Sequence, residues 1–200
     1  MNIWNVNYNV DEYMWCIFRE TDSMNFSQFS QLFINEDTLA NTLPKDIVLK
    51  NKDKKDNSPI ADMMACSGTM SGIVSEKVKE LFEKEYSGLF CFFPACLDEL
   101  PNVKYYILLP TVYLVAENVL DMEHTKIKYV GDNIERGIIF DIQEYSFTRN
   151  VKGHHFFRMA FNNGGKKLYT FRYCDDEFKD FIEKNNITGL EFTKIFELKD

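Results

Sequence analysis

The hydrophobic and polar positions of the chain follow two periodicities, and each predicts a different kind of element. At the N-terminus, WNVNYNV places an apolar side chain at every second position, which predicts a half-buried strand. The apolar run EYMWCIF predicts a second strand. Residues 20–43 are mostly polar, but Phe26, Phe29, Leu32 and Phe33 have helical spacing, which indicates a short helix.

One pattern occurs twice, about 100 residues apart. In each copy a short apolar strand ends at a residue that can cap a helix, Ser75 in the first and Asp175 in the second. Each helix ends near a glycine, Gly88 or Gly189, that can adopt positive φ before the next strand begins. The helices carry matching apolar stripes, Val78, Leu81 and Phe82 in one and Phe178, Phe181 and Ile182 in the other. The pattern predicts an internal repeat of strand, helix and strand.

The segments between the two copies are mostly apolar and predict further strands. KYYILL and TVYLV flank Pro110, GIIFDI is a buried run, and NNGGKK predicts a hairpin turn between HHFFRMAF and LYTFRYC. Because most of these strands are neighbours along the chain, we predict an α+β fold. Its sheet should be largely antiparallel, with the two similar strand–helix–strand units packed around it.

The chain divides into two regions by composition. We expect an acidic N-terminal segment rich in strands at 1–43, and one compact α+β domain at 44–200. The charged run at 51–59 contains no apolar residue and predicts an exposed loop. Five cysteines without a C-x-x-C pair, behind a start unlike a signal peptide, indicate free thiols in a reducing cytoplasm.

The net charge of −8 is unevenly distributed. Residues 1–43 hold six acidic residues and one arginine, whereas residues 44–60 hold five lysines and three aspartates. An acidic chain repels nucleic acid and anionic membranes, and it favours a basic protein partner. Acidity also serves solubility alone, so it does not decide the function. The longest apolar runs are too short to span a bilayer.

The sequence contains no residue pattern typical of a cofactor site, a metal site or a catalytic triad. A strand rather than a helix follows NNGGKK, so this run does not predict a phosphate loop. His154 and His155 are adjacent and would face opposite sides of a strand, which makes a shared metal difficult. There is no G-x-S-x-G, although Cys174 could pair with either histidine. We therefore predict a protein that is not an enzyme, with no cofactor and no metal.

The most distinctive polar and aromatic run is GHHFFRM. Alternate positions of a strand share a face, which groups its side chains as His155, Phe157 and Met159 on one face and His154, Phe156 and Arg158 on the other. One interpretation is a core strand whose His and Arg side chains are satisfied by carboxylates. The other is a recognition surface anchored by Arg158, because arginine and aromatic residues concentrate binding energy at interfaces.

Several segments, taken in order, resemble a family of small bacterial proteins. They are I-V-S-E before a basic residue at 73–77, K-Y-Y-x-L at 104–108, D-x-E at 121–123, G-H-x-x-F-R at 153–158 and T-G-L-E-F at 188–192. The family, formerly a domain of unknown function, is classed among the immunity proteins of polymorphic toxin systems as immunity protein family eleven. The resemblance covers residues 60–198 and leaves out 1–43. It departs at His155, where the family more often has an acid.

The resemblance implies a cytoplasmic protein, encoded beside a toxin, that binds and neutralises it without catalytic residues. We expect steric blocking of a cognate toxin domain, and the acidity of the chain favours a basic one. The expected contact residues are Asp11, Glu12, Glu20, Asp22, Glu36, Asp37, His154 and Arg158. Two alternatives remain. One is an enzyme that reverses a toxin's modification with His154, His155 and Arg158. The other is an adaptor domain that self-associates through a sheet edge, for example as a homodimer.

Overall fold

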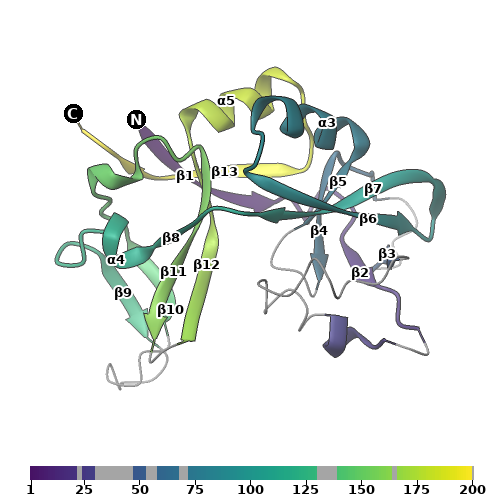
Figure 1. Cartoon of the computed structure of the whole chain (residues 1–200), viewed down its shortest axis with the longest axis horizontal. Helices are drawn as coiled ribbons and strands as arrows, with labels where there is room; N and C mark the ends of the chain where they lie inside the picture. Colours follow the sequence, from purple (N-terminus) through teal and green to yellow (C-terminus); the bar gives the residue numbers. More distant parts are fainter. Residues whose placement is uncertain are drawn as a thin grey trace. The chain divides into compact units, whose positions relative to one another are not determined.

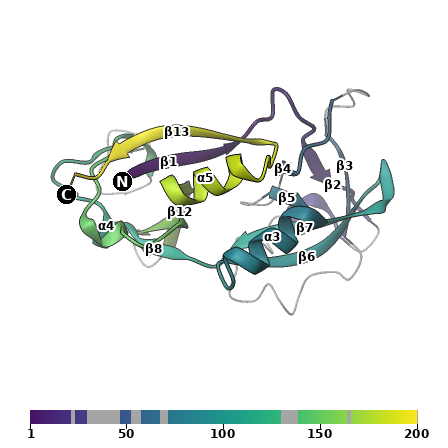
Figure 2. The same ribbon diagram turned by 90° about the horizontal axis from the view of Figure 1, so that it is seen from above.

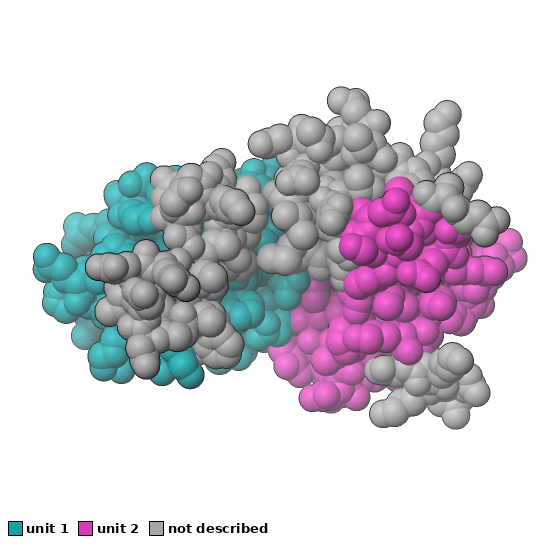
Figure 3. All heavy atoms as spheres, turned by 90° about the horizontal axis from the view of Figure 1, so that it is seen from below, with its two compact units in different colours: residues 1–7, 110–185, 192–200 teal, residues 8–109, 186–191 magenta. Residues whose placement is uncertain are grey.

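Strands form most of this computed structural model, which describes residues 1–21, 24–29, 47–52, 58–67, 72–129, 139–163 and 166–199. The chain divides into two compact units (Figures 1 and 3). Unit 1 comprises residues 1–7, 110–185 and 192–200, and unit 2 comprises residues 8–109 and 186–191. Each unit is therefore assembled from segments that are far apart in the sequence.

Unit 2 is built around a closed barrel of six strands. In order around the barrel they are β2 (Cys16–Phe18), β3 (Ile47–Asn51), β6 (Phe90–Leu97), β7 (Leu100–Pro110), β5 (Gly72–Ser75) and β4 (Met63–Ser67). The pairs β2–β4 and β3–β6 are parallel. The pairs β2–β3, β4–β5 and β5–β7 are antiparallel. Closure pairs every strand on both sides and so removes the sheet edges.

Alternate side chains of the barrel strands fill its interior. In β7, Tyr105, Ile107 and Leu109 are buried in the core of unit 2. In β6, Leu97 is buried whereas its neighbour Cys96 is exposed. Successive residues of a strand point to opposite faces, so the alternation that predicts a strand also selects its buried face.

The helix α3 (Glu76–Glu85) follows β5 as the sequence pattern predicts. The hydroxyl of Ser75 accepts the backbone N–H of Val78 at 3.4 Å and caps the first turn. Val78 and Phe82 are buried, and the Phe82 ring stacks on Phe90 of β6 at 4.8 Å between centroids. The predicted cap is therefore confirmed, and of the predicted stripe Val78 and Phe82 are buried whereas Leu81 is half-buried.

A further helical segment begins at Phe26, within the region where a short helix was predicted. The side chains of Asn25 and Gln28 each accept the other residue's backbone N–H at 2.9 Å, which is a reciprocal cap. Phe29 is buried and stacks on Phe18 at 4.3 Å between centroids. The other two residues of the predicted stripe, at 32 and 33, lie outside the described residues.

Unit 1 contains most of a five-stranded sheet and a separate two-stranded sheet. The larger sheet has the order β13 (Leu190–Glu197), β1 (Asn2–Tyr8), β12 (Lys166–Asp175), β11 (Phe156–Asn163) and β8 (Tyr113–Val115). Its β1–β12 and β11–β12 pairs are antiparallel, and its β11–β8 pair is parallel. Figure 2 shows β13 beside β1. The smaller sheet pairs β9 (Lys126–Tyr129) with β10 (Ile139–Glu144).

The two faces of the larger sheet are covered by different elements. On one face α5 (Asp176–Lys184) packs its Phe178 on Phe156 of β11, at 4.9 Å between ring centroids. On the other face Phe157, Met159 and Tyr173 form a core with α4 (Ala116–Val119), η3 (Arg149–Val151) and part of β10. The alternation predicted for the HHFFRMAF strand explains this division, because neighbouring residues of β11 point to opposite faces.

The predicted fold class was wrong. We expected an α+β fold with a largely antiparallel sheet and two strand–helix–strand units packed around it. The protein is instead mostly β, with a closed barrel and, among the described strands, three parallel pairs. Moreover, α3 belongs to unit 2 and α5 to unit 1, so the two helices do not flank one common sheet. The error arose because parallel partners such as β3 and β6 are far apart in the sequence, and local patterning does not show which strands pair.

Three further predictions lie partly or wholly outside the described residues. They are the boundary between 43 and 44, the centre of the loop at 51–59, and the two turn glycines at 164 and 165. The strands on either side of that turn, β11 and β12, do form the predicted antiparallel hairpin.

Candidate binding surface

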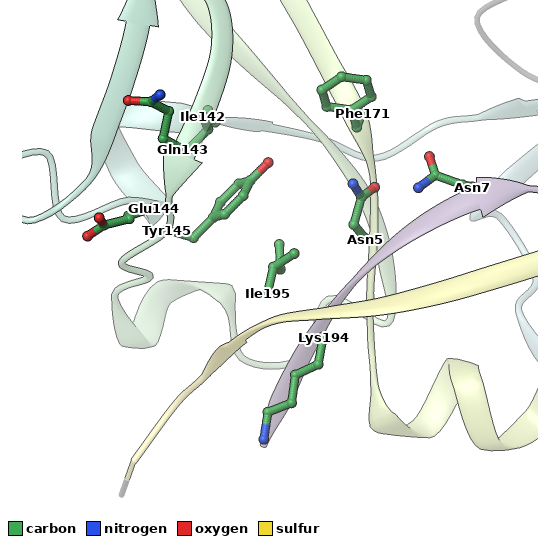
Figure 4. A pocket seen from close by; sticks show the side chains of 9 residues that line it. All are labelled: Asn5, Asn7, Ile142, Gln143, Glu144, Tyr145, Phe171, Lys194 and Ile195. Atoms are coloured by element: carbon green, nitrogen blue, oxygen red, sulfur yellow. The ribbon is translucent and has the colours of Figure 1, made fainter.

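The described part of unit 1 contains an open pocket of about 770 Å³ between the end of β10 and one face of the five-stranded sheet (Figure 4). Its lining side chains come from β1, β10, β12 and β13 and from the residue after β10. All of them belong to unit 1. The volume is within the range of about 300–1,000 Å³ that is usual for ligand sites. This pocket is therefore our candidate for a binding surface.

Two aromatic side chains line the pocket. Phe171 of β12 is 49% exposed, the largest exposed fraction among the large hydrophobic residues that the structure describes. Phe171 and Tyr173 are two residues apart in β12, so their side chains project from the same face of the sheet. Asn5 of β1 pairs with Tyr173. Tyr173 is buried in the core of unit 1, whereas Phe171 reaches the pocket. Tyr145 is held at the pocket by its hydroxyl, which lies 3.2 Å from the hydroxyl of Tyr173.

Three amide side chains add polar groups to the pocket, namely Asn5, Asn7 and Gln143. The Oδ1 atom of Asn5 is buried and, within the described part of the chain, accepts no hydrogen bond. A buried acceptor without a donor costs about 1–3 kcal/mol.

The charged residues at the pocket are already paired. Lys126 Nζ lies 2.5 Å from a carboxylate oxygen of Glu144, and Lys194 Nζ lies 2.8 Å from one of Glu197. The hydrogen bond from Lys194 lowers the pKa of Glu197 below its ordinary value. Figure 4 shows the side chains of Glu144 and Lys194 extending away from Tyr145. The centre of the pocket therefore offers aromatic and amide groups rather than a net charge.

The acidic residues that were predicted as contacts lie elsewhere. Asp11, Glu12 and Glu20 are exposed in unit 2. The other three, Asp22, Glu36 and Asp37, are outside the described residues. By sequence, unit 2 as a whole holds 17 acidic and 10 basic residues, a formal charge of −7 out of −8 for the chain. The excess of acidic residues at 1–43 is thus part of a negative charge that extends over the whole of unit 2.

The two predicted contacts in GHHFFRM are at least partly buried. His154 is half-buried, and its ring meets Phe157 edge-on at 6.4 Å between centroids. Arg158 has an exposed fraction of 0%, and its guanidinium lies 5.4 Å from the centroid of the Tyr113 ring. Its backbone N–H donates to the carbonyl of Val112 at 3.1 Å. Arg158 is therefore placed inside unit 1 rather than on its surface.

His155 contacts the cap of α5. Its Nδ1 lies 2.9 Å from Oδ2 of Asp175, while Oδ1 of Asp175 accepts the backbone N–H of Phe178 at 3.0 Å. Glu177 is further away, with an oxygen 3.7 Å from the same Nδ1. The neighbouring thiol of Cys174 is buried, and burial raises its pKa, which disfavours the nucleophilic thiolate. The arrangement links β11 to the start of α5 and has the character of a structural contact.

Among the described residues, no three His, Cys, Asp or Glu side chains are grouped so that they could hold a metal ion. The described helices include none that is long and apolar enough to cross a membrane. The five cysteines are free, with Cys91 and Cys96 exposed and the other three buried.

The model of the immunity protein family Imm11 matches residues 7–197 of the chain. The chain belongs to the Imm11 immunity protein family. The resemblance seen in the sequence is thereby confirmed, and the match also includes most of the segment at 1–43, to which that resemblance did not extend. No curated protein matches this Imm11 chain. Membership of the family indicates a role in toxin immunity.

The T-G-L-E-F segment of this Imm11 chain has a structural role in unit 2. Both the backbone N–H and the hydroxyl of Thr188 donate to Oδ2 of Asp62, each at 3.2 Å. Gly189 has φ +99°, and its carbonyl accepts the backbone N–H of Asn9 at 3.0 Å. A Cβ atom at Gly189 would lie only 1.8 Å from the carbonyl oxygen of Met63. The turn at 186–191 therefore needs glycine both for its conformation and for its close approach to β4.

Other segments that carry the family resemblance also have local structural roles. Ser75 of I-V-S-E caps α3, as described above. Oδ1 of Asp121, in D-x-E, accepts the backbone N–H of Glu123 at 3.1 Å within a turn. Its other oxygen lies 2.7 Å from Nδ1 of His124, and this contact with the histidine lowers the pKa of Asp121. The roles seen for these segments concern the fold, so they do not locate a partner surface.

The sequence did not reveal the pocket residues of this Imm11 protein. Phe171 alternates regularly with Tyr173 in LYTFRYC, so the pattern predicted only that it belongs to a strand. Asn5 and Asn7 occupy the polar positions of WNVNYNV, which indicate a solvent-facing side. Only the pairing of β1 with β12 and the position of β10 bring these side chains together.

Proposed function

We propose that this Imm11 protein protects a bacterial cell by binding a cognate toxin domain and sterically blocking its active surface in the cytoplasm. The observation that carries the proposal is the family match over residues 7–197. Toxin immunity is the family's role, whereas one-to-one binding, steric blocking and the cytoplasmic location are our proposals.

The environment of the residues considered for chemistry supports binding rather than catalysis. Arg158 is fully buried beside Tyr113, where a substrate in solution would not reach it. His155 contacts the carboxylate that caps α5, and burial raises the pKa of the Cys174 thiol. A catalytic cysteine is usually partly exposed, with a lowered pKa. We therefore propose a protein that acts by occupancy and not by turnover.

The charge distribution supports a basic toxin as the partner. Unit 2 carries a formal charge of −7, and its exposed acids include Asp11, Glu12 and Glu20. A strongly charged surface accelerates association with a partner of opposite charge and loses this effect as salt rises. The same charge repels phosphate groups, so we propose that neither nucleic acid nor an anionic membrane is the partner.

Co-expression of the chain with the toxin encoded beside it tests the proposal. The account expects growth to be restored and the two proteins to co-elute from a sizing column as a stable complex. Restored growth without a complex would contradict steric blocking and favour reversal of a toxin's modification. A homodimer of this chain without any affinity for the toxin would favour the adaptor hypothesis instead.

A further inference from the structure

Unit 2 has a groove of about 420 Å³ beside β6 and β7, which are neighbouring strands of the barrel (Figures 1 and 2). It is lined by residues 94–96 of β6, by residues 101–106 of β7 and by the first two residues of β3. The pocket of unit 1 has no net charge at its centre, so it does not explain a preference for a basic partner. The groove, in contrast, belongs to the unit that carries a formal charge of −7.

Several side chains that line the groove are apolar and reach solvent. Val103 of β7 is 42% exposed, and Pro94 of β6 and Pro101 of β7 are exposed as well. Apolar surface of this kind gains free energy when a partner covers it. The proline ring also fixes φ, so these walls have little conformational freedom to lose when a partner packs on them.

Tyr106 forms a further wall of the groove and is held by two polar contacts. Its hydroxyl donates to Oε1 of Glu76 at 3.5 Å, and Nζ of Lys79 lies 5.3 Å from the centroid of its ring. Tyrosine is frequent among the residues that dominate binding energy at interfaces. Because these contacts already fix the ring, the wall is in place before a partner binds.

The charges around the groove are mainly acidic. Asp98 and Glu99 form the exposed turn that joins β6 to β7, and Glu76 contacts Tyr106 as described. Lys104, which lines the groove, lies 2.9 Å from Glu76, and Arg19 lies 2.7 Å from Asp98. Exposed pairs of this kind are weak and are screened by salt. The excess of carboxylates, here and over unit 2 as a whole, attracts a basic partner and repels an acidic one.

We propose that the toxin inserts an apolar side chain into this groove of unit 2, and that basic residues beside it in the toxin meet the surrounding carboxylates. An apolar centre within a charged rim is the usual anatomy of a protein interface. The apolar lining supplies the contact area, and the acidic surroundings select a basic partner. This inference rests on the proposed function, and it names the surface of the chain and the kind of toxin segment that make the contact.

Two cysteines of the wild-type chain test the contact without any substitution. Cys96 lines the groove, whereas Cys91 of the same strand does not, and both thiols are free and exposed. The probe is the toxin domain encoded beside this chain, inactivated in its own active site and added in saturating amount. Alkylation by N-ethylmaleimide is followed at each cysteine by mass spectrometry. We expect bound toxin to slow alkylation of Cys96 about tenfold or more and to change that of Cys91 less than about twofold.

A pair of variants of the full-length chain supplies a second readout. Val103→Arg places a positive charge in the groove. Val10→Arg is the matched control, because Val10 is 41% exposed in unit 2 and does not line the groove. Both variants change the net charge equally, so a difference between them reports the site. We expect Val103→Arg to weaken toxin binding about thirtyfold or more and Val10→Arg less than about threefold.

The outcomes separate this inference from the proposed function. A wild-type complex in which Cys96 is alkylated as fast as in the free chain would overturn the groove as the contact and leave the proposed function standing. Equal binding by Val103→Arg and Val10→Arg would overturn it as well. Slower alkylation of Cys96 in the chain alone, increasing with its concentration, would identify a second copy as the occupant and overturn the toxin contact. If the wild type forms no complex at all, the proposed function fails and this inference fails with it.

Discussion

Replacing Gly189 by alanine should destabilise unit 2 much more than the same change at Gly88. Both glycines follow a helix and have positive φ, +99° and +83°. At Gly88 a Cβ atom would meet no heavy atom within 4 Å, so the substitution adds only backbone strain of about 1 kcal/mol. Gly88→Ala is therefore a control for conformation alone.

At Gly189 the new Cβ would lie 1.8 Å from the carbonyl oxygen of Met63 and 2.6 Å from Cβ of Ala61. The turn must then move away from β4. This movement threatens two backbone hydrogen bonds, from Met63 to Thr188 and from Asn9 to Gly189, both 3.0 Å long. Two such bonds at about 1 kcal/mol each, added to the strain, give a loss of about 3–4 kcal/mol.

Urea unfolding followed by circular dichroism measures the difference. With a slope of about 2 kcal/mol per M, Gly189→Ala should lower the midpoint by about 1.5–2 M and Gly88→Ala by about 0.5 M. Equal midpoints for the two variants would refute the reasoning, because they would show that the close approach to β4 contributes nothing measurable.

Three further outcomes are expected. Asp175→Ala removes the cap of α5 and should cost about 1–2 kcal/mol in urea unfolding; an unchanged midpoint would contradict the cap. A thiol reagent should label only Cys91 and Cys96 in the folded protein and all five cysteines in urea, because the other three are buried. Asp11→Asn with Glu12→Gln should slow toxin association several-fold at low salt, with little effect on dissociation measured by surface plasmon resonance; unchanged rates would exclude these carboxylates from steering.

The helices could be predicted because their signals are local. A capping residue at Ser75 or Asp175, an apolar stripe within the next two turns and a glycine after the end are all contained in about fifteen residues. Strands such as β1 and β12 were predicted equally well, since their alternation is visible in single segments. Each of these features depends on the chain's immediate neighbours and on no distant partner.

The barrel could not be predicted in the same way. It requires β3 to pair with β6 in parallel across more than forty residues of chain, as Ile47 opposite Ala95 shows. It also places α3 and α5 in different units although their sequences are alike. Similar local sequences were taken as evidence of one shared sheet, whereas the long-range pairings that decide the architecture leave no local signal.

The residues of the candidate binding surface could not be predicted for the same reason. Arg158 combines a charge with aromatic neighbours, which is typical of interface anchors, yet it is buried over Tyr113. Phe171 has an ordinary place in an alternating strand, yet it is half exposed beside amides that come from another strand. The packing of distant segments decides which aromatic or charged side chains reach solvent. Local sequence patterns do not predict that packing.

Titration of the toxin's activity with purified chain tests the central claim most directly. A blocking protein acts by occupancy, so at toxin concentrations well above the dissociation constant inhibition should rise linearly and be complete at one equivalent. Dissociation of the complex should then return active toxin. Complete and lasting inhibition by a few hundredths of an equivalent would show turnover and contradict steric blocking. No inhibition at several equivalents would contradict immunity against that toxin altogether.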